Sequence, residues 1–275
     1  ARRALPVDGP TPALPEIAER LRHYCHLADW IEHDGPGPFW DAMSPAAALS
    51  GRPEALLTPA LHVGGWFDYF LPGTIEAHAA FRQAGAPTRL VIGPWGHLDW
   101  GARSGPDGFG EAARGVVDRI QVAWFDRFLK GRNNGVEGDD PILLFDVTRG
   151  AWRGFTDWPA RRETLFLTGD GRAAPASSGR LSRECPADRG AETFVHDPWR
   201  PVPARGGWMA MPDGPAERSD IDDRADVAVF ETAPLEAPCR LAGPVDLALD
   251  LSSPCRALDV VAILSRVRPD GRAAT

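Results

Sequence analysis

The chain has 275 residues, 43% of them hydrophobic and 25% charged, which suffices for one large domain or two ordinary ones and excludes global disorder. Its formal net charge of -8 argues against a nucleic-acid partner, because such binding needs a basic surface. Its apolar runs, such as 258–264, are far shorter than the roughly 20 residues of a membrane-spanning helix, so no membrane partner is expected.

The first half of the chain alternates between helical and strand-like patterns. Apolar residues recur every three or four positions over 15–31 and again over 112–129, and each pattern predicts an amphipathic helix. Between them, the apolar runs 60–63 and 89–92 each end at a glycine and enclose a helical segment at 72–84. Strand, helix and strand at this spacing predict a βαβ unit, and therefore a parallel sheet.

Beyond about residue 140 the pattern changes to short apolar runs separated by connections rich in glycine, proline and aspartate. Along 245–251, one valine and three leucines alternate with Asp, Ala and Asp, which is typical of a half-buried antiparallel strand. No convincing helix follows Lys130. This half therefore predicts an all-β sandwich. Its other predicted strands are 142–147, 164–167, 193–195 and 226–230.

The cysteines give no sign of a metal centre. No two of them form a C-x-x-C pair, and none sits beside a matching pair of histidines. We therefore expect no zinc site, no other metal and no cofactor. Nothing in a chain of this size requires a disulfide. The four are Cys25, Cys185, Cys239 and Cys255.

Two ionisable residues follow the two predicted strands of the βαβ unit. Asp68 comes after Gly-Gly-Trp-Phe at 64–67, and His97 comes after Gly-Pro-Trp-Gly at 93–96. Ligands of an open parallel sheet bind beyond the carboxyl ends of its strands, so both side chains are expected at the functional edge. An aspartate followed by a histidine matches the last two members of the Ser…Asp…His order of α/β-hydrolases. There the carboxylate orients the imidazole, and the imidazole moves the proton.

Other interpretations of these residues stay open. Asp68 is also well placed to cap the following helix, and His97 could be an ordinary loop histidine. Asp99 could join them as a third metal ligand, although no H-x-H or H-x-x-x-H pair supports such a site.

The nucleophile that this order requires is missing from its expected place. An α/β-hydrolase presents its serine in a G-x-S-x-G turn between a strand and a helix, upstream of the aspartate. Ser44 and Ser50 precede Asp68, but neither lies between glycines after an apolar strand. Downstream, Ser104 has the pattern of a loop serine. We therefore expect none of the three to be the nucleophile.

Two longer stretches around Asp68 and His97 resemble a known family. They are Pro-Ala-Leu-His-Val-Gly-Gly-Trp-Phe-Asp-Tyr-Phe at 59–70 and Leu-Val-Ile-Gly-Pro-Trp-Gly-His at 90–97. Both are similar to the cocaine esterase and X-Pro dipeptidyl-peptidase family, which also contains α-amino-acid ester hydrolases and glutaryl-type acylases. The resemblance covers nearly the whole chain. Further matching stretches are 30–33, 39–40, 44–45, 124–131, 152–153, 157–159, 194–203 and 222–227.

The resemblance implies a three-part architecture. Residues 1–48 would be the end of a helical cap, 49–159 the C-terminal part of an α/β-hydrolase domain with a parallel sheet, and 160–275 an all-β jelly roll of galactose-binding-like type. The jelly roll is expected to be incomplete, because residues 268–272 (Arg-Pro-Asp-Gly-Arg) have the pattern of a hairpin turn whose second strand is cut off.

The resemblance also assigns roles to individual residues. Asp68 would be the acid of a catalytic triad and His97 its base, while Phe70 would help to wall the acyl pocket. Trp66 and Trp95 are expected in the two catalytic loops, where they would shield the substrate pocket; the alternative for the tryptophans is ordinary filling of the core and of domain interfaces. The serine and the oxyanion hole of the family lie upstream of the cap. We therefore expect both before the first residue, and expect this chain alone to be inactive.

Two functions fit the sequence. The first is a serine hydrolase that cleaves esters or amides, including acyl and X-Pro dipeptidyl substrates, through an acyl-enzyme. Its substrates would be small molecules or peptide N-termini. The second is a non-catalytic binding protein that uses the β-sandwich, with a degenerate hydrolase domain; a G-x-S-x-x-G motif upstream of the cap would favour the enzyme. A homodimer is compatible with either, and the acidic charge and the lack of a visible export signal favour the cytoplasm.

Overall fold

The structure is a computed structural model, which describes residues 27–33, 35–97, 108–159, 161–174, 178–187, 190–208, 212–255 and 258–275. The chain divides into two compact units, 1–58 and 59–275. In the described part of the chain, no helix has the length and apolar character to cross a membrane.

The described residues of the first unit form short helices joined by tight turns. Prolines in the first turns of three of them supply a fixed backbone angle where an amide hydrogen is not needed. Aromatic rings pack between the helices: His33 stacks on Phe39 at 4.2 Å, and the indole of Trp40 donates to the His33 carbonyl at 2.6 Å. Of the predicted helix 15–31, residues 15–26 lie outside the described residues. The helices are α2 (Leu27–Glu32), α3 (Pro38–Asp41), α4 (Pro45–Ser50) and the 3-10 helix η1 (Pro53–Leu57).

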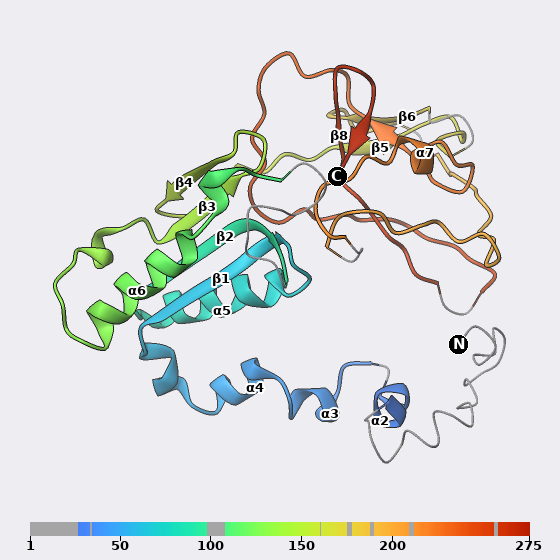
Figure 1. The fold of residues 1–275 in the computed structure, drawn as a ribbon. Coiled ribbons are helices and arrows are strands. Elements are labelled where there is room, and N and C mark those ends of the chain that lie inside the picture. The colour runs from blue at the N-terminus through green and yellow to red at the C-terminus, as the bar shows by residue number, and fades with distance from the viewer. Residues whose placement is uncertain are drawn as a thin grey trace. The chain divides into compact units, whose positions relative to one another are not determined.

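The second unit begins with a four-stranded sheet (Figure 1). Its strands lie in the order β1-β2-β3-β4; the first three are parallel, and β4 is antiparallel to β3. The helix α5 (Leu71–Ala84) connects β1 to β2, so the predicted βαβ unit and its parallel sheet are confirmed. The strands are β1 (Ala60–Phe67), β2 (Thr88–Gly96), β3 (Ile142–Asp146) and β4 (Ala151–Phe155).

The core of this unit lies along β2. All residues of β2 except the first are buried, as expected for a parallel strand covered on both faces. Leu90 and Ile92 are fully buried and pack with Ile142 and Leu144 of β3. Leu71 and Ile75 of α5 pack against the same cluster, which fixes the helix on the sheet.

Glycines in left-handed conformations set the helix boundaries. Gly85 ends α5 with φ of 87°, a conformation that favours glycine. The predicted helix 112–129 is broken at Gly115, which has φ of 60°. A 3-10 turn, η2 (Glu111–Ala113), therefore precedes the helix α6 (Val116–Phe128), which buries Val117 and Trp124.

The rest of the second unit, the C-terminal part that follows β4, has short strands of two to four residues and is otherwise mostly irregular in its described residues. A three-stranded sheet has the order β5-β6-β7, and β8 pairs with β9 across the predicted hairpin turn. The expectation that this turn lacks a second strand is wrong, because β9 is present and pairs with β8. The elements are β5 (Phe166–Thr168), β6 (Gly179–Ser182), the helix α7 (Ser219–Asp222), β7 (Phe230–Glu231), β8 (Arg266–Val267) and β9 (Ala273–Ala274).

Several sequence predictions for this half need correction. The change of pattern near residue 140 assigned 142–147 to the all-β half, but this segment forms β3 and joins the parallel sheet beside β2. The segments 193–195 and 245–251 form no strand, and of the predicted strand 226–230 only Phe230 lies in one. The apolar side chains of 245–251 are 41% to 71% exposed. Short helical turns do follow residue 130, at α7 and at the 3-10 turn η3 (Val136–Gly138). Alternation shows that a segment can pair, but a strand forms only where a neighbouring strand accepts its hydrogen bonds.

Candidate active site

Asp68 and His97 meet at the carboxyl edge of the parallel sheet. Phe67, the last residue of β1, lies beside Gly96, the last residue of β2. The residue after each strand therefore emerges at the same edge, and His97 Nδ1 lies 3.3 Å from Asp68 Oδ2. The structure thus brings together the two ionisable residues that the sequence predicted at this edge.

The turn between β1 and α5 holds the Asp68 carboxylate in place. Its Oδ1 accepts a hydrogen bond from the backbone N–H of Phe70 at 2.9 Å. The backbone N–H of Asp68 donates to Gly65 O at 3.1 Å, and its carbonyl accepts from Leu71 N at 3.1 Å. One carboxylate oxygen therefore stabilises the turn that precedes α5, while Oδ2 faces the imidazole. Asp68 is not the cap of α5, because the N-cap residue is Phe70 and no side chain caps this helix.

His97 is oriented by the carboxylate but stays accessible. Its side chain is 43% exposed, whereas that of Asp68 is 12% exposed. With Nδ1–H donating to the carboxylate, the neutral ring carries its lone pair on Nε2. No described residue hydrogen-bonds to that nitrogen. The imidazole is therefore arranged to accept a proton at Nε2, and the carboxylate is arranged to stabilise the cation that results.

Two aromatic rings pack against the imidazole. The ring centroids of Tyr69 and Phe70 lie 5.3 Å and 4.9 Å from that of His97, and 4.3 Å from each other. Both rings are about half exposed, at 45% and 55%. The sequence reasoning named Phe70 and missed Tyr69, although its position directly between Asp68 and Phe70 could have indicated it.

The structure corrects the expected positions of the two tryptophans. Trp66 lies in β1 and Trp95 in β2, so neither is in a loop. The indole of Trp66 donates to Phe145 O at 2.8 Å. Trp95 is 1% exposed, and its ring lies 5.7 Å from that of Trp152. The indole of Trp66 therefore reaches β3, and that of Trp95 lies beside a residue of β4.

Glycine is required where β1 approaches β2 just before the site. A Cβ on Gly65 would collide with the backbone carbonyl of Trp95, and a Cβ on Gly93 would collide with its indole ring. The strand register also shifts between Gly65 and Phe67. The Gly-Gly and Gly-Pro pairs, which the sequence suggests as turns, therefore lie inside the strands and allow them to pack closely.

The serines of the first unit have structural positions. Ser44 lies at the N-terminus of α4, and the hydroxyl of Ser50 donates to Ala47 O at 2.7 Å. Ser104 and Asp99, the third group of the metal alternative, lie outside the described residues. Within the described ranges, no group of three or more His, Cys, Asp or Glu side chains is arranged to hold a metal ion.

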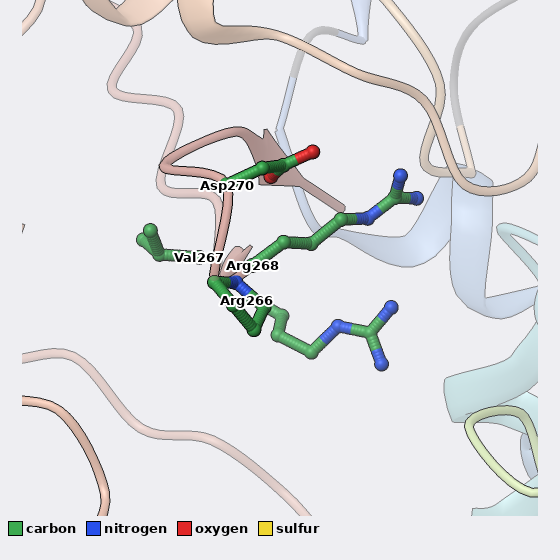
Figure 2. A pocket seen from close by; sticks show the side chains of 5 residues that line it. Arg266, Val267, Arg268 and Asp270 are labelled. Atoms are coloured by element: carbon green, nitrogen blue, oxygen red, sulfur yellow. The ribbon is translucent and has the colours of Figure 1, made fainter.

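A surface hollow of about 450 Å³ lies along the β8–β9 hairpin. Figure 2 shows the side chains of Arg266 and Arg268 extending to the same side of this hairpin. The hollow contains none of the residues predicted for catalysis, so the candidate active site is the sheet edge that carries Asp68 and His97. The hollow is lined by Arg266, Val267, Arg268, Pro269 and Asp270.

Two family profiles match the chain in succession. The X-Pro dipeptidyl-peptidase (S15 family) profile matches residues 9–99, which include both Asp68 and His97. The profile of the X-Pro dipeptidyl-peptidase C-terminal non-catalytic domain matches residues 134–275, which include β3, β4 and the C-terminal part that follows them. These matches fit part of an α/β-hydrolase domain followed by a C-terminal β domain.

Individual proteins show the same relationship. The cocaine esterase of Rhodococcus sp. (strain MB1 Bresler) is 34% identical over 88% of this chain and 43% of its own length. A protein of Mycobacterium bovis named as a serine esterase is 27% identical over 98% of this chain and 48% of its own length. The crystal structure of an aminopeptidase from a marine sediment archaeon (Thaumarchaeota archaeon) is 26% identical, with a TM-score of 0.55 over 68% of this chain and 31% of that one.

The chain spans about half the length of the curated relatives that it matches. The C-terminal profile alone covers more than half of the chain, and the stretches that carry Asp68 and His97 fall within the S15 profile. The chain belongs to the cocaine esterase and X-Pro dipeptidyl-peptidase family.

Proposed function

We propose that this chain carries the acid and the base of a serine hydrolase that cleaves esters or amides through an acyl-enzyme. The observation that carries the proposal is the hydrogen bond between His97 Nδ1 and Asp68 Oδ2 at the carboxyl edge of a parallel sheet, where the His97 side chain is 43% exposed. The relatives support the hydrolase class, since they are named as esterases and an aminopeptidase.

In the proposed mechanism, His97 moves one proton in each direction. Nε2 takes the proton from the serine hydroxyl as the serine oxygen bonds to the substrate carbonyl carbon. The imidazolium is stabilised by the Asp68 carboxylate, and it then protonates the leaving alcohol or amine as the bond to that group breaks. Water repeats the cycle on the acyl-enzyme, which releases the acid and restores the serine.

We place the serine and the oxyanion hole outside these 275 residues. Neither Ser44 nor Ser50 has the glycine-flanked strand-to-helix turn that presents such a nucleophile, and both belong to short helices or their ends. The curated relatives are about twice as long as their matched regions, which leaves room for such a segment. The proposal divides the chain into a cap end (1–48), a hydrolase part (49–159) and a jelly roll (160–275).

The substrate is proposed to present an ester or amide carbonyl next to an apolar group. Tyr69 and Phe70 offer half-exposed rings beside His97, and apolar surface of this kind is buried favourably by a substrate. A small-molecule ester, an amide or a peptide N-terminus meets this requirement.

Labelling with a fluorophosphonate probe tests where the nucleophile lies. The 275-residue chain is expected to incorporate no stoichiometric label, because a loop or helix-end serine lacks an oxyanion hole and an oriented base. The full-length protein is expected to take up one probe per chain. Stoichiometric labelling of the 275-residue chain would place the nucleophile within it, and an unlabelled full-length protein would favour the non-catalytic binding function.

A further inference from the structure

A pair of histidines lies between β1 and α5, with His78 buried and His62 half-buried. His62 on the strand and His78 on the helix meet edge to face, with ring centroids 5.6 Å apart and an angle of 78° between the planes. Phe81, one turn further along α5, packs on His62 at 5.2 Å. His78 is only 2% exposed. The Nε2 atoms of both rings are buried and have no hydrogen-bond partner among the described residues.

The charged groups around this pair do not favour a positive imidazole. On α5, Arg82 lies close enough to His78 to act on it through its charge, and its guanidinium binds Asp157 Oδ1 at 3.3 Å and Thr156 O at 2.9 Å. Glu76 on the same helix is exposed.

On the sheet side, β2 also offers no compensating charge. The residue beside His62 in the register is the apolar Leu90. The adjacent Arg89 forms an ion pair with Asp139. Burial therefore lowers the pKa of His78 to about 4, with further lowering by His62 and Arg82, and burial also lowers the pKa of His62.

We propose that His62 and His78 form an acid-sensitive clasp, which holds α5 on β1 while both rings are neutral and releases the helix when they are protonated. A protonated ring at this interface would be a buried cation next to a second imidazole and a guanidinium, with its Nε2–H unpaired. Moving the helix outwards lets water reach the ring.

Release of α5 would disturb the candidate active site. The turn that holds Asp68 lies directly between β1 and α5, and its carboxylate is fixed by Phe70 N at the start of that helix. Leu71 and Ile75 would leave the core at the same time. The release itself does not depend on the proposed hydrolase function, whereas its consequence for catalysis does.

The pH range over which the clasp weakens follows from the pKa of His78 in the folded and in the unfolded chain. Above about 6.5 the ring is neutral whether the chain is folded or unfolded, so the clasp contributes fully to stability. Between about 6.5 and 4 the unfolded chain binds a proton that the folded chain does not, and the unfolding constant rises about tenfold for each pH unit lost. Below about pH 4 the folded and the unfolded chain both bind the proton, and the contribution of His78 to stability is gone.

Urea unfolding of the 275-residue chain at pH 7.5 and pH 5.0 tests the clasp. Between these values, the unfolding constant of the wild type is expected to rise about 30-fold more than that of His78→Leu, which cannot be protonated. The carboxylates of the two proteins are identical, so their effect cancels. His196→Leu removes an exposed histidine and is the matched control, expected to keep the wild-type pH dependence. Equal pH dependence in the wild type and His78→Leu would overturn the proposal.

Two measurements on the wild type keep the test decisive if His78→Leu does not fold. The NMR signal of the His78 ring is expected to stay in its neutral position down to pH 5, and titration between pH 6 and 7 would overturn the clasp. Amide exchange at pH 5 is expected to be faster in α5 than in β3, and equal protection would argue against local release. None of these readouts needs a nucleophile, so their failure would leave the proposed hydrolase function untouched.

Discussion

Replacing His97 with alanine in the full-length protein is expected to lower kcat for a p-nitrophenyl ester about ten-thousandfold or more, while the protein stays folded. In the proposed mechanism, the substitution removes the group that takes the serine proton and returns it to the leaving group. The ring is 43% exposed and lies outside the main core, so its loss should change the unfolding midpoint little. Steady-state kinetics and a urea titration measure the two effects separately.

The control for this experiment is His196→Ala. His196 is an exposed histidine of the C-terminal part and has no place in the proposed mechanism, so its variant should retain wild-type kcat and KM. A His97→Ala protein whose kcat falls by less than tenfold would reject His97 as the base. It would leave the Asp68–His97 hydrogen bond as a structural feature of the turn.

The positions of the two residues proposed as acid and base could be predicted because the relevant rule is geometric. Adjacent parallel strands end at one edge, so residues that directly follow them must lie close together. The sequence identifies β1 and β2 by their apolar runs, and the order in which Asp68 and His97 occur limits the chemistry. The 3.3 Å separation of Nδ1 and Oδ2 then follows from the strand register, in which Phe67 lies beside Gly96.

What the sequence could not predict is which segments become neighbours. The run 142–147 has the pattern of a strand, but its composition does not say that it pairs with β2 rather than with the later β segments. The alternating segment 245–251 shows the converse, since it has the pattern of a strand and no strand partner in the described chain. The sequence pattern of a segment shows that it can form a strand, whereas tertiary contacts determine which strand it pairs with.

The glycines before the site illustrate a second limit. Gly-Gly after a short apolar run suggests a turn, yet β1 continues through Gly64 and Gly65 to Phe67. The reason is the closeness of β2, where the Trp95 carbonyl occupies the space that a side chain at Gly65 would need. Only the structure distinguishes a glycine that bends the chain from one that admits a neighbouring backbone.

Gly65→Ala is therefore expected to disturb the fold and the site together. Its methyl group would meet the backbone carbonyl of Trp95, which cannot rotate away, so the ends of β1 and β2 must separate. Such overpacking typically costs about 1–3 kcal/mol of unfolding free energy. Asp68 and His97 follow the two strand ends, so a shift of about 1 Å between them would lower kcat of the full-length protein about a hundredfold.

Gly73→Ala is the matched control for this substitution. Gly73 lies in the first turn of α5, and a Cβ there would meet no atom within 4 Å. Because alanine loses less backbone entropy than glycine in a helix, this variant should gain about 0.5–1 kcal/mol of stability. Urea unfolding of the 275-residue chain compares the two variants, and kinetics of the full-length protein compare their kcat values. If Gly65→Ala were as stable and active as Gly73→Ala, the close approach of β1 and β2 could not be what aligns the acid with the base.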